Sequence, residues 1–124
     1  MKYGYTKRTD LAFADAVRKA KEELAKEGFG ILTEIDVKAT IKKKLGVEYD
    51  GYLILGACNP ALSYKALQAE KEIGLLLPCN VIMYEDDGSV FVSAILPTAA
   101  MQVFDNEEVR AVAKEAELKL LSSD

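Results

Sequence analysis

Two cysteines carry the clearest potential for chemistry in this chain, and each stands directly before an asparagine, as Cys58-Asn59 and Cys79-Asn80. A reactive thiol pair, a soft-metal site and two packed core thiols all use this residue type. Asn59 followed by Pro60 is typical of a helix start, where backbone N–H groups and the helix dipole lower the pKa of a thiol. The chain has no histidine to act as a base for Cys58, which follows an apolar run. This favours a packed thiol over a reactive one.

Metal binding needs more ligands than two thiols provide. Zinc takes four ligands, normally cysteine and histidine. Two thiolates with Met101 suit Cu(I), which prefers soft ligands, and a dimer could pool four thiols. No short Cys-x-x-Cys spacing supports either arrangement. We therefore predict no metal and no cofactor, and Cys58 and Cys79 are the residues that would hold a metal if one were bound.

The two asparagines have different explanations. Asn59 is explained as a helix N-cap. Asn80 falls in an expected strand, where asparagine is disfavoured, so it needs a local reason such as a side-chain bond to a turn. Because the Cys-Asn steps and the segment 97–104 are expected at strand ends, we predict a ligand or thiol site there. Its candidate residues are Cys58, Asn59, Cys79, Asn80 and Met101.

No catalytic residue can be assigned from the sequence. The carboxylates fall on expected helix surfaces and helix caps, and the glycines at 28, 30 and 46 read as helix stops rather than as a phosphate-binding loop. The sequence therefore favours a protein that is not an enzyme.

The composition describes one soluble domain covering residues 1–124. Half of the residues are hydrophobic and 29% are charged, and the net charge of −4 gives no general attraction for nucleic acid. The N-terminus lacks an apolar signal-peptide core, and the longest uncharged run, 88–104, contains Pro97 and is shorter than the roughly 20 apolar residues of a membrane span. We expect a cytoplasmic protein that binds neither membranes nor nucleic acid.

The hydrophobic pattern predicts alternating strands and helices, followed by a hairpin and a last helix. Thr9 or Asp10 is the expected cap of the first helix, and Asp105 with Glu108 forms a capping-box-like start of the last one. This order, βαβαβαββα, indicates an α+β fold. The expected strands are 2–7, 31–35, 51–57, 79–85 and 90–96; the expected helices are 10–27, 37–45, 60–74 and one from 105 onward; and 97–104 is expected to be a loop.

Two further patterns concern burial. The run 51–57 is apolar at consecutive positions, which predicts a central strand covered on both faces. In the short helix 37–45, Ile41 and Leu45 are expected to be buried, which leaves its lysines on a solvated face.

Four tyrosines could give the sheet a face that a second subunit covers, so we expect a homodimer. They are Tyr3, Tyr5, Tyr52 and Tyr84.

Three segments resemble the family known as domain of unknown function 302: EGFGILTEIDVKATIKKKLG, ILGACNPALSYKALQAE and GLLLPCNVIMYE. The motif is a Cys-Asn-Pro at 58–60 followed by a Leu-Leu-Pro-Cys at 76–79. The resemblance implies a mainly antiparallel five-stranded sheet backed by helices, similar to that of the TATA-binding protein, and it implies dimers. It supplies no activity, and the likeness to a DNA-binding shape is fold analogy alone. An antiparallel sheet would bring both thiols to one end.

From these observations we expect a homodimeric ligand-binding or interaction domain. The alternative is a thiol-dependent redox or soft-metal protein that uses Cys58 and Cys79. Fast modification of Cys58 near neutral pH would favour the alternative.

Overall fold

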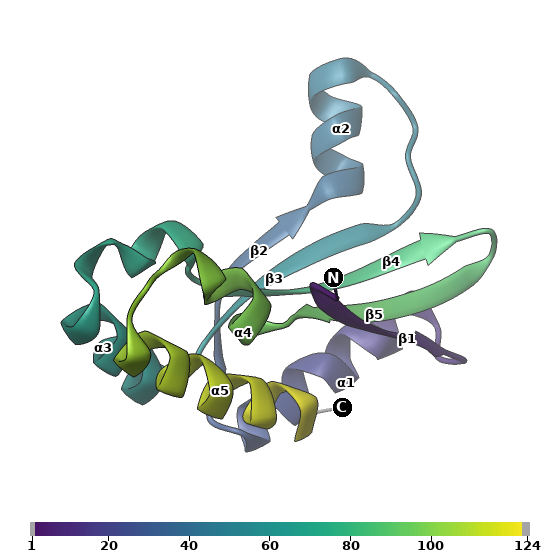
Figure 1. Cartoon of the computed structure of the whole chain (residues 1–124). Coiled ribbons are helices and arrows are strands. Elements are labelled where there is room, and N and C mark those ends of the chain that lie inside the picture. Colours follow the sequence, from purple (N-terminus) through teal and green to yellow (C-terminus); the bar gives the residue numbers. More distant parts are fainter. Residues whose placement is uncertain (1, 123–124) are drawn as a thin grey trace.

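A computed structural model describes residues 2–122 of the chain. It has five strands and five α-helices, and the predicted α+β class is confirmed (Figure 1). The strands are β1 (Gly4–Thr9), β2 (Gly30–Asp36), β3 (Tyr52–Cys58), β4 (Cys79–Asp86) and β5 (Ser89–Ile95); the helices are α1 (Phe13–Lys26), α2 (Val37–Leu45), α3 (Pro60–Ala69), α4 (Pro97–Ala100) and α5 (Glu107–Ser122); two 3-10 helices are η1 (Lys71–Leu76) and η2 (Met101–Val103).

The strands form one sheet in the order β1-β5-β4-β3-β2, and every neighbouring pair is antiparallel. This confirms the five-stranded antiparallel sheet that the family resemblance implied. Because side chains alternate along a strand, the register assigns each residue to one of two faces. Leu55 opposite Val81 belongs to one face, and Tyr52 opposite Tyr84 belongs to the other.

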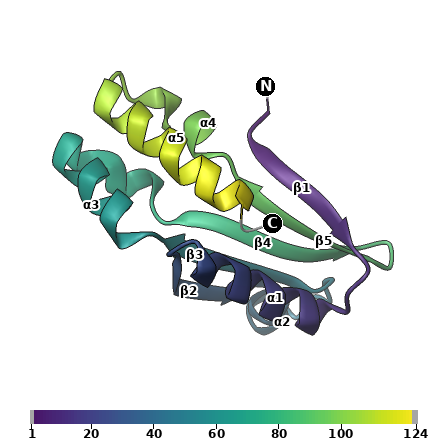
Figure 2. The same ribbon diagram turned by 90° about the horizontal axis from the view of Figure 1, so that it is seen from below.

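Helices α1 and α5 lie against one face of the sheet, and α2 projects from the opposite side (Figures 1 and 2). On the helix-covered face, α1 buries Leu24 against Leu55, Val81 and Met83, and Leu120 of α5 joins this core. A second apolar cluster joins α3, η1, η2 and α5 beyond the end of the sheet. It consists of Ala66, Ile73, Met101, Val109 and Ala113.

The opposite face, which we call the open face, consists of Tyr52, Ile54, Ile82, Tyr84 and Phe91. All five side chains keep partial exposure. The prediction that 51–57 would be covered on both faces is therefore wrong. The strand does lie in the interior of the sheet, since β3 pairs with β2 on one side and with β4, the middle strand, on the other. Consecutive apolar residues in β3 serve a buried face on one side and the open face on the other.

Helix α2 is capped as the sequence predicted, but it is not buried. Asp36 Oδ1 accepts a hydrogen bond from the Ala39 N–H at 2.9 Å, and Gly46 ends the helix with φ of 67°. No residue of α2 is buried, and Leu45 is 73% exposed. The expectation of a buried Ile41 and Leu45 is wrong because the helix stands out from the sheet instead of lying on it (Figure 1).

The start of the first helix differs from prediction for a local reason. Thr9 is still part of β1, and its Oγ1 accepts a hydrogen bond from the Leu11 N–H at 3.2 Å, so the chain turns before α1 begins at Phe13. Neither Thr9 nor Asp10 caps the helix; the N-cap position is Ala12, without a side-chain bond.

The last helix begins at Glu107 and is capped by Asn106 rather than Asp105. Asn106 Oδ1 accepts bonds from the N–H groups of Glu108 and Val109, while its Nδ2 donates to the Ala69 carbonyl. Asn106 thus caps α5 and ties it to the end of α3, where the predicted helix 60–74 breaks into α3 and η1. The expected loop 97–104 contains α4 and η2.

Candidate functional site

The two Cys-Asn steps meet where β3, β4 and α3 converge, a region we call the motif corner (Cys58, Asn59, Ser63 and Cys79). Ala57 is the direct antiparallel partner of Cys79, so both thiols lie at the same end of the sheet. Cys58 is half-buried, and its Sγ lies 3.1 Å from Ser63 Oγ in the first turn of α3. Cys79 is 8% exposed and belongs to the main core.

Asn59 joins two helices. Its Oδ1 accepts a hydrogen bond from the Leu62 N–H at 3.4 Å, which caps α3, and its Nδ2 donates to the Glu27 carbonyl at 3.3 Å, beyond the end of α1. It rests against Gly28, whose φ of 85° forms the turn after α1; a Cβ there would lie 3.2 Å from Asn59 Nδ2. Asn59 therefore has a structural role in positioning both helices.

The protonation of Cys79 is fixed by its surroundings. Burial, with a smaller contribution from the neighbouring Cys58, raises the pKa of the Cys79 thiol from 9.0 to about 11. A buried thiolate loses its hydration and gains no compensating partner. Cys79 therefore stays a neutral thiol near neutral pH, and Cys58 is the more accessible thiol of the pair.

The structure brings together some of the predicted site residues but not all of them. Asn59, Cys79 and Met101 line one cavity of about 20 Å³, large enough for a single water. Cys58 adjoins it through Ser63, which is also part of the wall. Asn80 is exposed; because it pairs with Gly56, it points to the other face of the sheet.

The motif corner offers little room and few ligands. Its cavity is otherwise lined by apolar side chains. Within residues 2–122, no group of three or more histidine, cysteine, aspartate or glutamate side chains is arranged to hold a metal ion. The corner therefore has the character of a packed junction.

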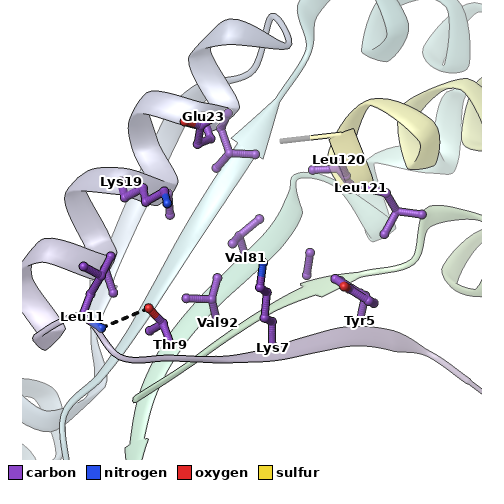
Figure 3. A pocket seen from close by; sticks show the side chains of 14 residues that line it. Tyr5, Lys7, Thr9, Leu11, Lys19, Glu23, Val81, Val92, Leu120 and Leu121 are labelled. Atoms are coloured by element: carbon purple, nitrogen blue, oxygen red, sulfur yellow. Dashed lines mark hydrogen bonds between the residues drawn. The ribbon is translucent and has the colours of Figure 1, made fainter. Parts of the chain in front are cut away.

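A larger cavity, which the sequence did not predict, lies between α1, the end of α5 and strands β1, β5 and β4. We call it the α1 cavity. Its volume is about 110 Å³ (Figure 3). The space exists because small side chains face each other across it: Ala16 and Ala20 on α1, and Ala94 on β5. The alanine pair at i and i+4 was the available signal in the sequence, but it is also typical of any well-packed helix.

The mouth of the α1 cavity is polar. Lys7 extends from β1 and Lys19 from α1, and both side chains point toward the space between the two elements (Figure 3). Tyr5 and Glu23 also line it. Tyr5 lies on the helix-covered face, so it does not share a face with Tyr52 and Tyr84 as the expected tyrosine cluster required.

On the open face, aromatic side chains form a ladder across three strands. Tyr52 and Tyr84 stack with ring centroids 5.7 Å apart, and Tyr84 stacks on Phe91 at 5.2 Å. Tyr49, before β3, extends the ladder at 6.4 Å from Tyr52. Such a ladder stabilises neighbouring strands and also presents apolar area to a partner.

Together, the fold and these sites define a small α+β domain with one helix-covered face and one open face. The chain belongs to the family described as domain of unknown function DUF302, whose model matches residues 5–122. A solved structure of an uncharacterised conserved DUF302 protein from Bacillus stearothermophilus is similar, with a TM-score of 0.93 and 23% identity over 99% of this chain and 96% of that one. That likeness shows the fold. No curated protein matches the chain.

No helix within residues 2–122 combines the length and apolarity needed to cross a membrane.

Proposed function

We propose that the protein is a homodimeric ligand-binding domain and not an enzyme. The observation that carries this proposal is the α1 cavity of about 110 Å³, which has an apolar floor and a polar mouth. Ligand sites in proteins combine an apolar interior with a small number of polar groups that orient the ligand. The motif corner, in contrast, has room for one water.

The open face supports the homodimer. Its aromatic ladder lies on the side of the sheet from which α2 projects, and α2 exposes Leu45. A nine-residue helix is not stable in water by itself, so α2 gains from packing on a partner. Helix α2 carries four lysines and the β4–β5 hairpin carries Glu85, Asp86 and Asp87, so a two-fold pairing that sets α2 of one subunit against the hairpin of the other would bring opposite charges together.

Ligand binding is tested with 1-hexanol as a neutral apolar probe. It is titrated into ¹⁵N-labelled protein, and backbone amide shifts are followed in two-dimensional NMR spectra. We expect shifts confined to α1, β5 and the end of α5. Ala20→Leu should abolish them because it fills the cavity, whereas Ala111→Leu, on the exposed surface of α5, should leave them unchanged. Hexanol shifts that survive Ala20→Leu, or no shifts in the wild type, would refute the cavity as the ligand site.

The homodimer is tested by light scattering after gel filtration. We expect twice the chain mass of 13.6 kDa for the wild type. Tyr84→Ser should shift the protein toward the monomer, while Tyr64→Ser, on the exposed surface of α3, should not. Circular dichroism checks that both variants remain folded. A wild type that is monomeric at every concentration would end this part of the proposal.

The thiol-dependent alternative rests on one observation, the half-buried Cys58 at the start of α3 beside Ser63 and near Cys79. In this reading hydrogen peroxide oxidises Cys58 to a sulfenic acid, releasing one water, and Cys79 displaces a second water to form a disulfide. In the cytoplasm, which we propose as the location, such a bond would be transient. Mass spectrometry after mild oxidation decides: loss of two hydrogens per chain supports the alternative, and an unchanged mass excludes it.

A further inference from the structure

The ligand-binding proposal can be sharpened because the α1 cavity has a defined chemistry. We propose that it takes a small monocarboxylate whose apolar tail has about three to five carbons. This inference rests on the proposed ligand-binding function. It also assigns a role to Lys19, whose part in binding the proposed function leaves open.

The floor of the cavity requires an apolar tail. It is formed by buried Leu24, Val81 and Leu120, with Val92 and Ala94 beside them. These side chains offer no hydrogen bond, so a polar group placed among them would lose its hydration without replacement. The polar end of a ligand must therefore lie at the mouth.

The volume sets the length of the tail. A cavity of about 150 Å³ with aliphatic walls holds a benzene molecule. At about 110 Å³, the α1 cavity encloses a group smaller than benzene, with about three or four carbons, and the rest of a hexanoate tail lies at its mouth. A long-chain fatty acid would not fit within this volume.

The mouth selects an anion. Lys19 on α1 brings a positive charge to one wall, and Lys7 on β1 lies on the opposite wall (Figure 3). Lys19 makes no ion pair among residues 2–122. The acidic residue of the lining, Glu23, is paired with Lys26 at 3.0 Å, so much of its charge is already balanced.

Tyr5, another residue of the lining, has a cation on its ring. Lys2 Nζ lies 5.6 Å from the centroid of the Tyr5 ring, and Tyr5 is part of the lining. The Lys19 ammonium can donate hydrogen bonds to a carboxylate, and the Tyr5 hydroxyl is a further hydrogen-bond donor of the lining. A neutral alcohol accepts only a weaker hydrogen bond from the ammonium than a carboxylate does, because its oxygen carries no charge, and a cation is repelled.

The test compares three probes of matched chemistry: hexanoate, 1-hexanol and acetate. Affinities are measured from the NMR shifts described above. We expect hexanoate to bind about ten-fold more tightly than hexanol, because a charged hydrogen bond contributes that much or more. Acetate should cause no localised shifts, since it has no tail to bury.

Variants show which side chain causes the preference for hexanoate over hexanol. Lys19→Met keeps the apolar stem but removes the charge, so it should weaken hexanoate binding about ten-fold and leave hexanol binding unchanged. Lys65→Met, on the exposed surface of α3, is the matched control and should change neither. Butyrate and octanoate, measured on the wild type, test the tail length without any substitution, and both should bind more weakly than hexanoate.

The outcomes separate this inference from the proposed function. Equal affinity for hexanoate and hexanol, or an unchanged hexanoate affinity in Lys19→Met, overturns the carboxylate assignment while leaving ligand binding intact. If neither hexanoate nor hexanol shifts the residues around the cavity, both the inference and the proposed function fail.

Discussion

Replacing Asn59 by alanine should lower the free energy of unfolding by about 1–2 kcal/mol. Two hydrogen bonds are lost: the cap to the Leu62 N–H and the bond to the Glu27 carbonyl. Loss of an N-cap costs about 1 kcal/mol, and a typical intramolecular hydrogen bond contributes about the same. Both bonds are long, at 3.4 and 3.3 Å, so we expect each to contribute less to the free energy of unfolding than a hydrogen bond of ideal length.

Urea denaturation followed by circular dichroism measures this loss. Asn59→Asp separates the two bonds, because aspartate can still cap α3 but cannot donate to the Glu27 carbonyl. It should recover about half of the stability lost in the alanine variant.

The matched control is Asn80, the asparagine of the other Cys-Asn step. It is exposed and makes no side-chain hydrogen bond among residues 2–122, so Asn80→Ala should change stability by less than about 0.5 kcal/mol. Equal losses at Asn59 and Asn80 would refute the view that the Cys-Asn-Pro motif is a structural junction.

Two further predictions concern Cys79 and Gly56. The pKa of Cys79 is about 11 in the folded state against 9.0 in the unfolded chain, so its contribution to stability is complete below pH 9 and is lost as the pH rises toward 11. Denaturation across this range should show wild type losing about 2 kcal/mol more than Cys79→Ala; parallel curves would contradict this. Gly56→Ala should cost about 1–3 kcal/mol in urea denaturation, because its Cβ would collide with Thr33 Oγ1 and Pro78 Cγ, whereas Gly74→Ala meets no atom and should be neutral.

The sequence allowed the order of the elements to be predicted because short-range signals set it. The Asn59-Pro60 helix start and the Asp36 cap are local, and both are present in the structure. The start of the last helix shows what short-range sequence signals cannot predict. Asp105 and Asn106 are both good caps, and the contact of Asn106 with the Ala69 carbonyl, 37 residues away in sequence, favours Asn106.

Burial was predicted less well, because it depends on which elements lie against which. The apolar repeat of α2 is a true amphipathic pattern, yet Leu45 is 73% exposed within one chain. A pattern of this kind shows that a face needs covering but not which surface covers it. The same holds for β3, whose second face, with Tyr52 and Ile54, stays open.

The α1 cavity was not predictable from residue types, because a cavity depends on how the elements pack and not on the kind of any one residue. Ala16 and Ala20 read as ordinary core alanines, and Lys7 reads as a solvated residue of an edge strand. Only the crossing of α1 over β5 places these residues around one space. Cysteines and asparagines attract attention because they can do chemistry, whereas a binding site for an apolar tail needs no reactive residue at all.

The matched Cys-Asn steps therefore have different physical causes. In the first, Cys58 ends β3 and Asn59 starts α3, so the pair marks a strand-to-helix junction. In the second, both residues lie within β4, where alternation turns Cys79 into the core and Asn80 out to solvent. Since the second step has no cap to make, its asparagine contributes nothing to the junction. If the protein binds a ligand, it does so on the helix-covered face between α1 and β5, where the side chains are small and the mouth is basic.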